Sequence, residues 1–320
     1  MLKDATVVVT DYQYDSIDPI RTKMQEHGIA FSTYQCKTEE EVIRVTKNAE
    51  VVITHFTPIS EAVIDNLQHC KLIVRGAVGV DNINVDAAKR KGIPVANVPD
   101  YGRDDVANHV LMLMLALNKK VCLLNQAVKS GNWDFNQAKP IHRLQGKVLG
   151  LLGFGGIARL VAKKSQILDM KVQAYDPYVK QEDVSGLNVP ICSLEEVLQT
   201  SDVISIHMPL NRSTKHLLNK EVFSMMKHGA VLINTARGGI INERDLIEAL
   251  QCGKISAAGL DVLAEENIDA ANPLCSLDQV IITPHSAWYS EESVSILLNS
   301  VADEVLRALE GKPIRNPVWR

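Results

Sequence analysis

Apolar and polar positions follow two patterns along the chain. Short, nearly continuous runs of β-branched and aliphatic residues recur, and the segments between them repeat their apolar residues every three or four positions. Buried strands of a parallel sheet give the first pattern, and amphipathic helices give the second. Their alternation predicts an α/β protein with doubly wound parallel sheets.

Ten apolar runs predict strands. Four lie in the first third of the chain, at 6–11, 51–56, 71–76 and 94–98. Six follow in the middle, at 147–153, 171–176, 202–208, 230–236, 257–262 and 279–285. Ser60 predicts the start of a helix over 60–67, because serine is a favoured N-cap. Near its end the chain carries an amphipathic helix that opens on acidic residues and stops at Gly311 and Pro313.

Length and composition indicate a two-domain globular protein. The chain has 320 residues, of which 46% are hydrophobic and 22% are charged, and its net charge is −4. We place a domain crossing near residue 100, where proline, glycine and aspartate precede a long apolar helix. Lysine and arginine form no cluster, so we expect neither nucleic acid nor a membrane surface as a partner.

The cysteines and the most apolar segment indicate in which part of the cell we expect the protein. The six cysteines have no CxxC or zinc-ligand spacing, so we expect reduced, buried thiols and no metal site. Segment 106–124 contains His109 and is interrupted by residues 118–120, so it predicts a buried or subunit-interface helix rather than a membrane span. The first residues lead into a strand without a signal-peptide pattern. We therefore expect a soluble, cytoplasmic protein.

Polar and glycine residues gather where the predicted strands of the middle region end. In parallel α/β sheets, ligands bind beyond the carboxyl ends of the strands. The residues delivered there are Gly153, Asp176, His207, Thr235 to Arg237, Asp261 to Glu266, and His285. The pattern predicts a site at this edge of the sheet.

A glycine loop connects a strand to a helix at Gly153-Phe154-Gly155-Gly156-Ile157-Ala158. Gly153 permits a tight turn, Gly155 allows the backbone to approach a pyrophosphate, and the helix N-terminus attracts its negative charge. Asp176 ends the next strand, at the spacing expected for an acid that binds the ribose 2′-hydroxyl. Because this carboxylate repels a 2′-phosphate and no arginine follows it, we expect NAD rather than NADP.

Three chemically distinct side chains follow on successive strands. Arg237 could clamp a carboxylate or polarise a carbonyl, and the two glycines after it leave its surroundings open. A carboxylate from the 261–266 loop could hold the imidazole of His285, which would exchange a proton during hydride transfer. Two alternatives remain, a salt-bridge role for Arg237 and a structural role for His285 as a lone histidine after a strand.

The chain resembles the NAD-dependent D-2-hydroxyacid dehydrogenases over essentially its whole length. The motifs that carry the resemblance lie at 75–88, 98–117, 150–158, 207–214, 234–246, 259–267 and 282–290. The stretches "PHSAWYS" and "ARGGIINE" are most similar to the branch that contains the C-terminal-binding proteins, transcriptional corepressors that keep the fold and bind NAD.

The resemblance implies a domain organisation. Residues 1–99 and 290–320 would form a flavodoxin-like substrate domain, and residues 100–289 a Rossmann NAD-binding domain inserted in it. It further implies a cleft that closes on the ligand and a homodimer built on the helix after Asp105.

The resemblance also implies residue roles. Arg237 would bind the substrate carboxylate and orient the carbonyl, and His285 would be the acid/base, paired with Glu266. Glu265 is the competitor for that pairing, and the loop after it has Asn267 where the family usually has proline. The implied cofactor contacts are Val78, Gly153, Gly155, Gly156, Ile157, Asp176, Met208, Pro209, Thr214, Thr235, Ala236, Arg237, Asp261, His285 and Trp288. The implied substrate contacts are Arg75, Val78, Gly79, Arg237, Trp288 and His55.

Two functions are compatible with these motifs. The first is the reversible, NAD-dependent reduction of a small 2-keto acid to the D-2-hydroxy acid. The second is an NAD-sensing binding protein like the corepressors, with little or no turnover. His55, at the end of its strand, fits a structural role as well as a substrate contact. The sequence does not identify which 2-keto acid is the substrate.

Overall fold

A computed structural model describes residues 6–184 and 186–319, which divide into two α/β units. The first unit runs through Gly102 and resumes at Ser290, and the second is Arg103–Tyr289. We call them the substrate unit and the nucleotide unit, after the expectations above.

The sheet of the substrate unit is parallel throughout, with the strand order β2-β1-β3-β4-β5. Its strands are β1 (Thr6–Val9), β2 (Ala30–Thr33), β3 (Val51–Thr54), β4 (Leu72–Arg75) and β5 (Val95–Ala96). This flavodoxin-like order confirms the predicted fold class. The sequence did not predict β2, because no residue of this edge strand is buried and it therefore carries no apolar run.

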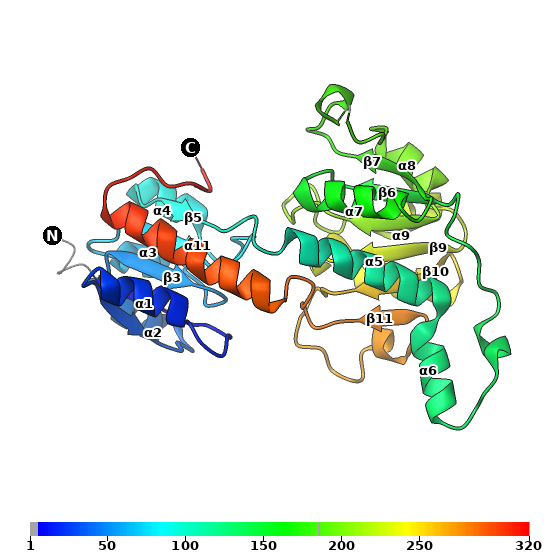
Figure 1. Cartoon of the computed structure of the whole chain (residues 1–320), viewed down its shortest axis with the longest axis horizontal. Helices are drawn as coiled ribbons and strands as arrows, with labels where there is room; N and C mark the ends of the chain where they lie inside the picture. The colour runs from blue at the N-terminus through cyan, green and yellow to red at the C-terminus, as the bar shows by residue number, and fades with distance from the viewer. Residues whose placement is uncertain (1–5, 185, 320) are drawn as a thin grey trace. The chain divides into compact units, whose positions relative to one another are not determined.

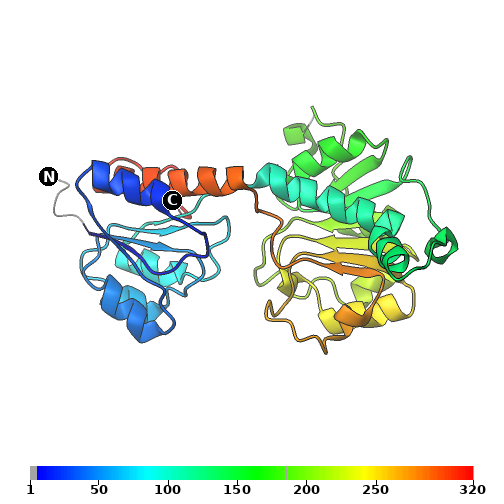
Figure 2. The ribbon, with the colours of Figure 1, turned by 60° about the horizontal axis from the view of Figure 1, so that its bottom comes forward.

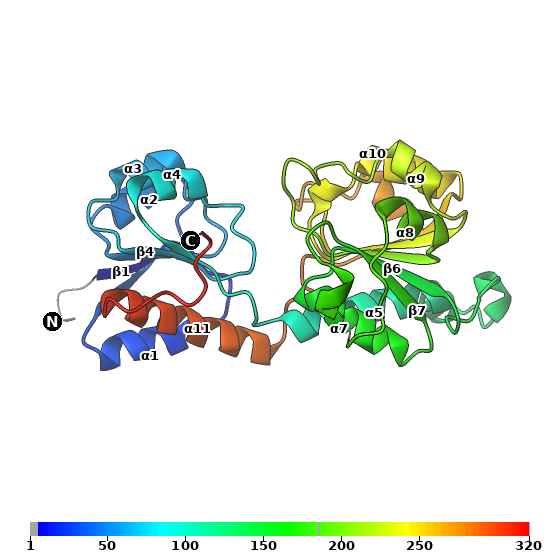
Figure 3. The ribbon, with the colours of Figure 1, turned by 90° about the horizontal axis from the view of Figure 1, so that it is seen from above.

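Helices cover both faces of this sheet. Figures 1 and 3 show α1 (Asp18–Glu26) and α11 (Glu291–Leu309) on one face, and α2 (Glu39–Thr46), α3 (Glu61–Asn66) and α4 (Val85–Lys91) on the other. Ser60 caps α3, as predicted, by accepting the Val63 N–H at 3.2 Å. After α11, the Val318 N–H bonds to the Val95 carbonyl at 2.9 Å, so segments far apart in the sequence build one unit.

The nucleotide unit contains all six strands predicted for the middle of the chain. They are β6 (Val148–Leu152), β7 (Lys171–Tyr175), β8 (Val203–Ile206), β9 (Ala230–Asn234), β10 (Ile255–Leu260) and β11 (Val280–Ile282). The sheet is parallel, in the order β11-β10-β9-β8-β6-β7. Ile191 forms a parallel bridge to Ala174 on the outer side of β7. Counting that bridge as a short third strand gives the dinucleotide-binding order 3-2-1-4-5-6 with one added strand, which confirms the predicted Rossmann domain.

The helices of the nucleotide unit divide between its two faces. Helices α5 (Arg103–Lys119) and α7 (Gly156–Gln166) lie on one face, and α8 (Leu194–Thr200), α9 (Lys220–Met225) and α10 (Glu243–Gln251) on the other (Figure 3). Short 3₁₀ turns are η1 (Phe135–Ala138), η2 (Gln181–Val184), η3 (Gly238–Ile240) and η4 (Pro273–Ser276). Helix α5 packs closely on β10, because a Cβ atom at Gly259 would lie only 3.1 Å from the Leu113 Cβ.

The predicted long helix is two helices. Lys120 has a φ of 50°, which ends α5, and α6 (Val121–Lys129) continues at an angle of 60°. Figure 1 shows α6 extending away from the sheet of this unit, and Figure 2 shows it nearly end-on with the following segment beside it. In the described part of the chain no single helix is long and apolar enough to cross a membrane, and only α5 and α6 taken together reach that length and composition.

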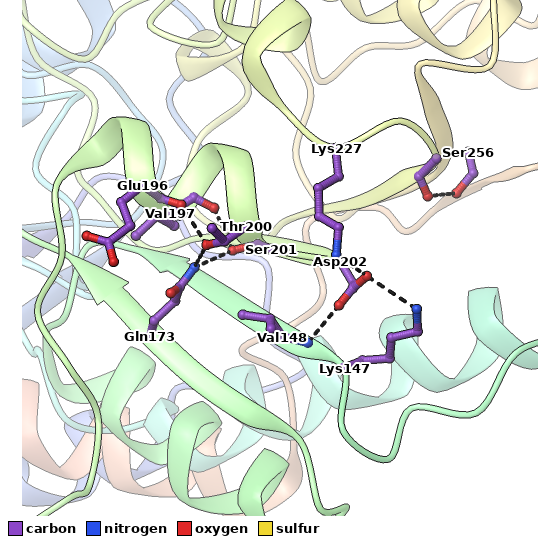
Figure 4. A network of polar contacts seen from close by, with 11 residues as sticks. Lys147, Val148, Gln173, Glu196, Val197, Thr200, Ser201, Asp202, Lys227 and Ser256 are labelled. Carbon is purple, nitrogen blue, oxygen red and sulfur yellow. Dashed lines mark hydrogen bonds and ion pairs between the residues drawn. The ribbon is translucent and has the colours of Figure 1, made fainter.

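Asp202 ties together the amino ends of three strands (Figure 4). Its carboxylate accepts the Val148 N–H at 2.9 Å and Lys227 Nζ at 2.6 Å, and its backbone carbonyl accepts the Val231 N–H at 3.0 Å. This end of the sheet is therefore a structural polar cluster, opposite the edge where the glycine loop lies.

The cysteine prediction is partly wrong. All six thiols are free, but Cys122, Cys252 and Cys275 are exposed and the other three are only partly covered. Absence of metal-ligand spacing says nothing about burial, and these cysteines fall on helix surfaces, turns and segment ends rather than on the apolar runs.

Candidate active site

The glycine loop follows β6 and leads into α7. Gly153 has a φ of +94°, and a Cβ atom there would lie 2.8 Å from the backbone carbonyl carbon of His207. Glycine is therefore required at this position for two reasons. The backbone is in the left-handed region, and the chain after β8 approaches too closely for a side chain. Gly155 differs, because no heavy atom lies within 4 Å of the Cβ it lacks. The loop thus has a tight turn at one glycine and open space at the next.

Asp176 lies directly beside this loop. Its carboxylate accepts the Phe154 N–H at 2.8 Å and the Tyr178 N–H at 2.9 Å. Arg103, which the sequence did not single out, lies against the first turn of α7: its Cζ would be 2.9 Å from a Cβ atom at Gly156. The start of α7 is thus flanked by a carboxylate that could meet a ribose and a guanidinium that could meet a phosphate.

The other predicted cofactor contacts line the same edge. Met208 is buried, and Thr214 closes the loop after β8 by donating to the Pro209 carbonyl at 2.6 Å. After β9, the Ala236 N–H bonds to Asn234 Oδ1 at 3.0 Å. The Thr235 hydroxyl oxygen is buried and makes no hydrogen bond within the described residues.

These features fit a dinucleotide. The open space at Gly155 can take a pyrophosphate against the N-terminus of α7, and the Asp176 carboxylate stands where a ribose hydroxyl would follow. The unpartnered Thr235 hydroxyl offers a polar contact further along the edge. The residues present therefore suit a nicotinamide dinucleotide.

Arg237 follows β9 in an extended conformation. Asn234 Nδ2 donates to its carbonyl at 2.9 Å, and its own Nη1 donates to the Ala236 carbonyl at 2.7 Å. The expectation that two glycines leave its surroundings open is wrong. A Cβ atom at Gly238 would lie 1.9 Å from the Leu263 carbonyl carbon, so this glycine instead lets the Arg237 turn pack directly on the loop after β10.

His285 pairs with a carboxylate. Its Nδ1 lies 2.8 Å from Glu266 Oε1 and 3.0 Å from Oε2, and both side chains are partly exposed. Of the two candidate acids, Glu266 is the one that the structure places on His285. Because Nδ1 faces the acid, Nε2 is the ring nitrogen that remains to meet a substrate.

The loop that carries His285 is held by Asp261. The Asp261 carboxylate is buried, and it accepts the Ser286 N–H at 3.0 Å and the Ala287 N–H at 2.9 Å. Its backbone carbonyl accepts the His285 N–H at 2.8 Å. His285 has a φ of 50°, a strained conformation that costs a non-glycine residue about 1–3 kcal/mol. The hydrogen bonds to Asp261 are what stabilise it.

Asp261 is in turn fixed from α5. Thr283 donates its hydroxyl to Asp261 Oδ1 at 2.6 Å, and His109 Nε2 lies 2.9 Å from the same hydroxyl oxygen. Burial lowers the pKa of His109, so the imidazole is neutral near pH 7. Since the threonine proton goes to Asp261, His109 Nε2 is the donor to Thr283. In the sequence, His109 stands out only as a polar residue in an apolar segment, and nothing marks Thr283.

Trp288 lies at the end of this loop. Its indole N–H donates to the His285 carbonyl at 2.9 Å, and its ring meets Tyr289 edge-on, at 5.7 Å between centroids. The tryptophan is therefore fixed to the segment that carries the histidine.

The substrate unit has its own candidate site after β4. The carbonyl oxygens of Ala77, Val78 and Gly79 accept from Val98 N–H at 3.0 Å, from Asn97 Nδ2 at 2.6 Å and from Arg75 Nη1, respectively. All three carbonyl oxygens therefore accept a hydrogen bond. The N–H groups of Val78 and Gly79, in contrast, make no hydrogen bond within the described residues. Two consecutive N–H groups of this kind could receive an anion, which is the role expected of them toward a substrate carboxylate, and we call this pair the cradle.

His55 lies beside this cradle. The ring is 1% exposed and packs over Gly76, where a Cβ atom would come within 2.3 Å of it. Burial lowers the pKa of His55 to about 4, so the ring is neutral. Its Nδ1 lies 3.1 Å from the Tyr14 hydroxyl. Tyr14 was absent from the sequence prediction, because nothing in the loop after the first strand distinguishes it.

Within the described residues no group of three or more histidines, cysteines or acids could hold a metal ion.

The structure brings together two sets of predicted residues, each at the carboxyl edge of one sheet. In the substrate unit they are Arg75, Val78, Gly79 and His55. In the nucleotide unit they are the glycine loop, Asp176, Arg237, Asp261, Glu266, His285 and Trp288.

Comparison with known proteins shows the family. Residues 111–287 match the model of the "D-isomer specific 2-hydroxyacid dehydrogenase, NAD binding domain". Hydroxypyruvate reductase of Blautia hydrogenotrophica is 38% identical over 280 residues, 86% of this chain and 87% of that protein. D-3-phosphoglycerate dehydrogenase of Archaeoglobus fulgidus is 36% identical over 296 residues, 92% of this chain but 56% of that protein. The chain thus spans little more than half of such longer relatives.

A solved structure gives the same result at the level of the fold. D-Lactate dehydrogenase of Aquifex aeolicus, in complex with NAD and lactic acid, superimposes with a TM-score of 0.90 at 31% identity and covers 98% of each chain. With a dinucleotide fold, a histidine–glutamate pair and a family match over more than half of its length, the chain belongs to the D-isomer specific 2-hydroxyacid dehydrogenase family.

Proposed function

We propose that the protein reduces a small 2-keto acid to the D-2-hydroxy acid, reversibly and with NAD(H) as cofactor. The observation that carries the proposal is the contact of His285 Nδ1 with Glu266, on a loop that Asp261 holds in a strained conformation. A histidine paired with an acid is the arrangement that a proton-transfer step requires.

The residues act as follows. A bound nicotinamide dinucleotide supplies the hydride. Glu266 fixes His285 so that Nε2 donates a proton to the keto oxygen in reduction and takes it back in oxidation. Arg237 orients the carbonyl and stabilises the charge that develops on its oxygen. The N–H groups of Val78 and Gly79 receive the substrate carboxylate.

NAD is favoured over NADP by the position of Asp176. Its carboxylate accepts the backbone N–H of Phe154 in the glycine loop and is thereby held where a ribose would lie. There it can accept a hydrogen bond from the 2′-hydroxyl, whereas a 2′-phosphate would meet a like charge.

A homodimer is favoured by the apolar surface around α5 and α6. Met112, Leu115, Val121 and Val128 are 39–49% exposed, and Trp133 and Phe135 on the following segment are 88% and 69% exposed. A cavity of about 590 Å³ adjoins this surface, lined in part by Leu117, Leu123 and Val203. A surface of this extent on one unit suits a second copy of the chain.

The first prediction concerns catalysis. We expect His285→Ala to lower kcat for 2-keto acid reduction about 10²- to 10⁴-fold while NADH binding changes far less, because His285 is one of many expected cofactor contacts but is the proton donor. Steady-state kinetics with glyoxylate, pyruvate and hydroxypyruvate, and fluorescence titration with NADH, measure both. A wild-type protein that binds NADH but reduces none of these acids would instead favour the corepressor-like function.

The second prediction concerns the support of His285. We expect Thr283→Val to lower kcat at least about tenfold, since the variant loses the hydrogen bond to Asp261 and the one from His109, each worth about 1 kcal/mol, and this loosens the loop. Thr46→Val is the control, because the Thr46 hydroxyl is also hydrogen-bonded but to the Val42 carbonyl within α2, in the other unit. Equal kcat losses in the two variants would show that the effect is general destabilisation.

The third prediction concerns the cofactor. Asp176→Ala should lower the NADH to NADPH ratio of kcat/KM by about 10- to 100-fold, the range expected for one charge-assisted hydrogen bond. Glu182→Ala, an exposed acid further along the same segment, should leave the ratio unchanged. An unaltered ratio in Asp176→Ala would rule out this basis for NAD selection.

The fourth prediction concerns assembly. The wild-type protein should have the molar mass of a dimer in light scattering, and Leu115→Glu combined with Val128→Glu should yield monomers, because each buries an unpaired charge. Ile167→Glu, on another exposed apolar residue of the same unit, should remain dimeric. A monomeric wild type would contradict the proposal.

A further inference from the structure

The two N–H groups of the cradle belong to peptide groups whose carbonyls are hydrogen-bonded. The Val78 N–H shares its peptide group with the Ala77 carbonyl, and the Gly79 N–H shares its peptide group with the Val78 carbonyl. The Ala77 carbonyl accepts the Val98 N–H at 3.0 Å. The Val78 carbonyl accepts Asn97 Nδ2 at 2.6 Å. Both donors therefore come from the two residues that directly follow β5.

Peptide geometry converts these two bonds into a direction for the N–H groups. A trans peptide group is planar, and its C=O and N–H point in opposite directions. Both peptide bonds are trans. Because the carbonyls of Ala77 and Val78 face the segment after β5, the N–H groups of Val78 and Gly79 point to the other side of the loop. One anion on that side can meet both of them.

The Asn97 amide is the one of these two donors that depends on residue type. A backbone N–H such as that of Val98 is present in every residue except proline. The donor to the Val78 carbonyl is instead a side-chain amide. An apolar residue in place of Asn97 would leave that carbonyl without this bond, and the peptide group that carries the Gly79 N–H would lose the contact that orients it.

The backbone at Asn97 is fixed by residues that follow α11. The Asn97 N–H bonds to the Asn316 carbonyl at 3.3 Å. One residue earlier, Ala96 forms an antiparallel bridge with Pro317. The hydrogen bond from the Val318 N–H to β5 continues this pairing. The pairing lies on the outer side of β5 and holds the point at which the chain leaves that strand.

Helix α11 anchors the paired segment in turn. The Arg315 N–H donates to both carboxylate oxygens of Glu304, at 3.2 Å each, and Glu304 is 2% exposed. The Arg315 guanidinium also lies near Asp303, with 3.6 Å between Nη1 and Oδ2. The side chain of Asn97 therefore extends from a backbone that is held on both sides, by β4 and by the segment that α11 anchors.

We propose that Asn97 is a positioning residue for the substrate: by holding the Val78 carbonyl, its amide directs the Gly79 N–H at the carboxylate of the 2-keto acid. The proposal rests on the proposed reductase function and adds a residue to it. Asn97 acts through the peptide group and takes no part in proton transfer. Every 2-keto acid has this carboxylate, and hydride transfer does not alter it, so the effect belongs to substrate binding in general.

The test uses Asn97→Leu, which keeps the approximate size of the side chain and removes its donor. We expect the KM values for glyoxylate, pyruvate and hydroxypyruvate to rise at least about tenfold, by a similar factor for each acid, because a hydrogen bond to a charged group is weakened. The kcat values should stay within about threefold, since the contact is made equally in the ground state and the transition state. The affinity for NADH should change far less, because the glycine loop and Asp176 lie in the other unit.

Asn66→Leu is the matched control. Asn66 also donates Nδ2 to a backbone carbonyl, that of Ala62 at 2.9 Å in α3 of the same unit. This variant should leave every KM unchanged. Asn97→Ala is a second variant without the donor and cannot crowd its neighbours, so it should raise KM as Asn97→Leu does. Thermal unfolding checks that each variant is folded.

The outcomes are distinct. An unchanged KM in the two Asn97 variants, a rise confined to one acid, a loss in kcat alone, or equal rises in Asn97→Leu and Asn66→Leu would overturn this proposal and leave the reductase function intact. Absence of wild-type turnover with all three acids would remove both. Calorimetry of the NADH-loaded protein with oxamate, which has the carboxylate but is not reduced, gives a readout without turnover. Its affinity should fall about tenfold in Asn97→Leu, and an equal affinity in wild type and variant would also overturn the proposal.

Discussion

The buried carboxylate of Asp261 is the group on which the catalytic segment depends. It accepts two backbone N–H groups and the Thr283 hydroxyl, while its own carbonyl accepts the His285 N–H. A histidine in the left-handed region would relax if these bonds were absent. One side chain at the end of β10 thereby sets the position of the acid/base, and the contact with Glu266 follows from that position.

This arrangement also links the catalytic segment to α5. Gly259 lets α5 approach β10, so that His109 reaches the Thr283 hydroxyl. Further along, the same helix exposes Met112 and Leu115. Helix α5 therefore combines support of the catalytic segment with the surface that we assign to the dimer.

The comparisons and the local structure answer different questions. Relatives that act on hydroxypyruvate and on phosphoglycerate match this chain at nearly the same identity, 38% and 36%. Similarity over the whole chain reflects the shared fold and reaction, which many positions determine. The choice of substrate side chain depends on a few residues, which similarity over the whole chain does not single out.

Local pattern was sufficient to predict the strands of both sheets except β2, the glycine loop, and the residues that strand ends deliver. These follow from periodicity and from the rule that parallel sheets present their carboxyl ends to a ligand. What the sequence could not provide were contacts between distant segments, because no periodicity encodes them. The family resemblance already paired Glu266 with His285, but tertiary structure alone linked His109 through Thr283 to Asp261, set Tyr14 on His55, and packed Gly238 against the Leu263 backbone. Each of these depends on how close two separate segments approach, and that distance is decided by packing.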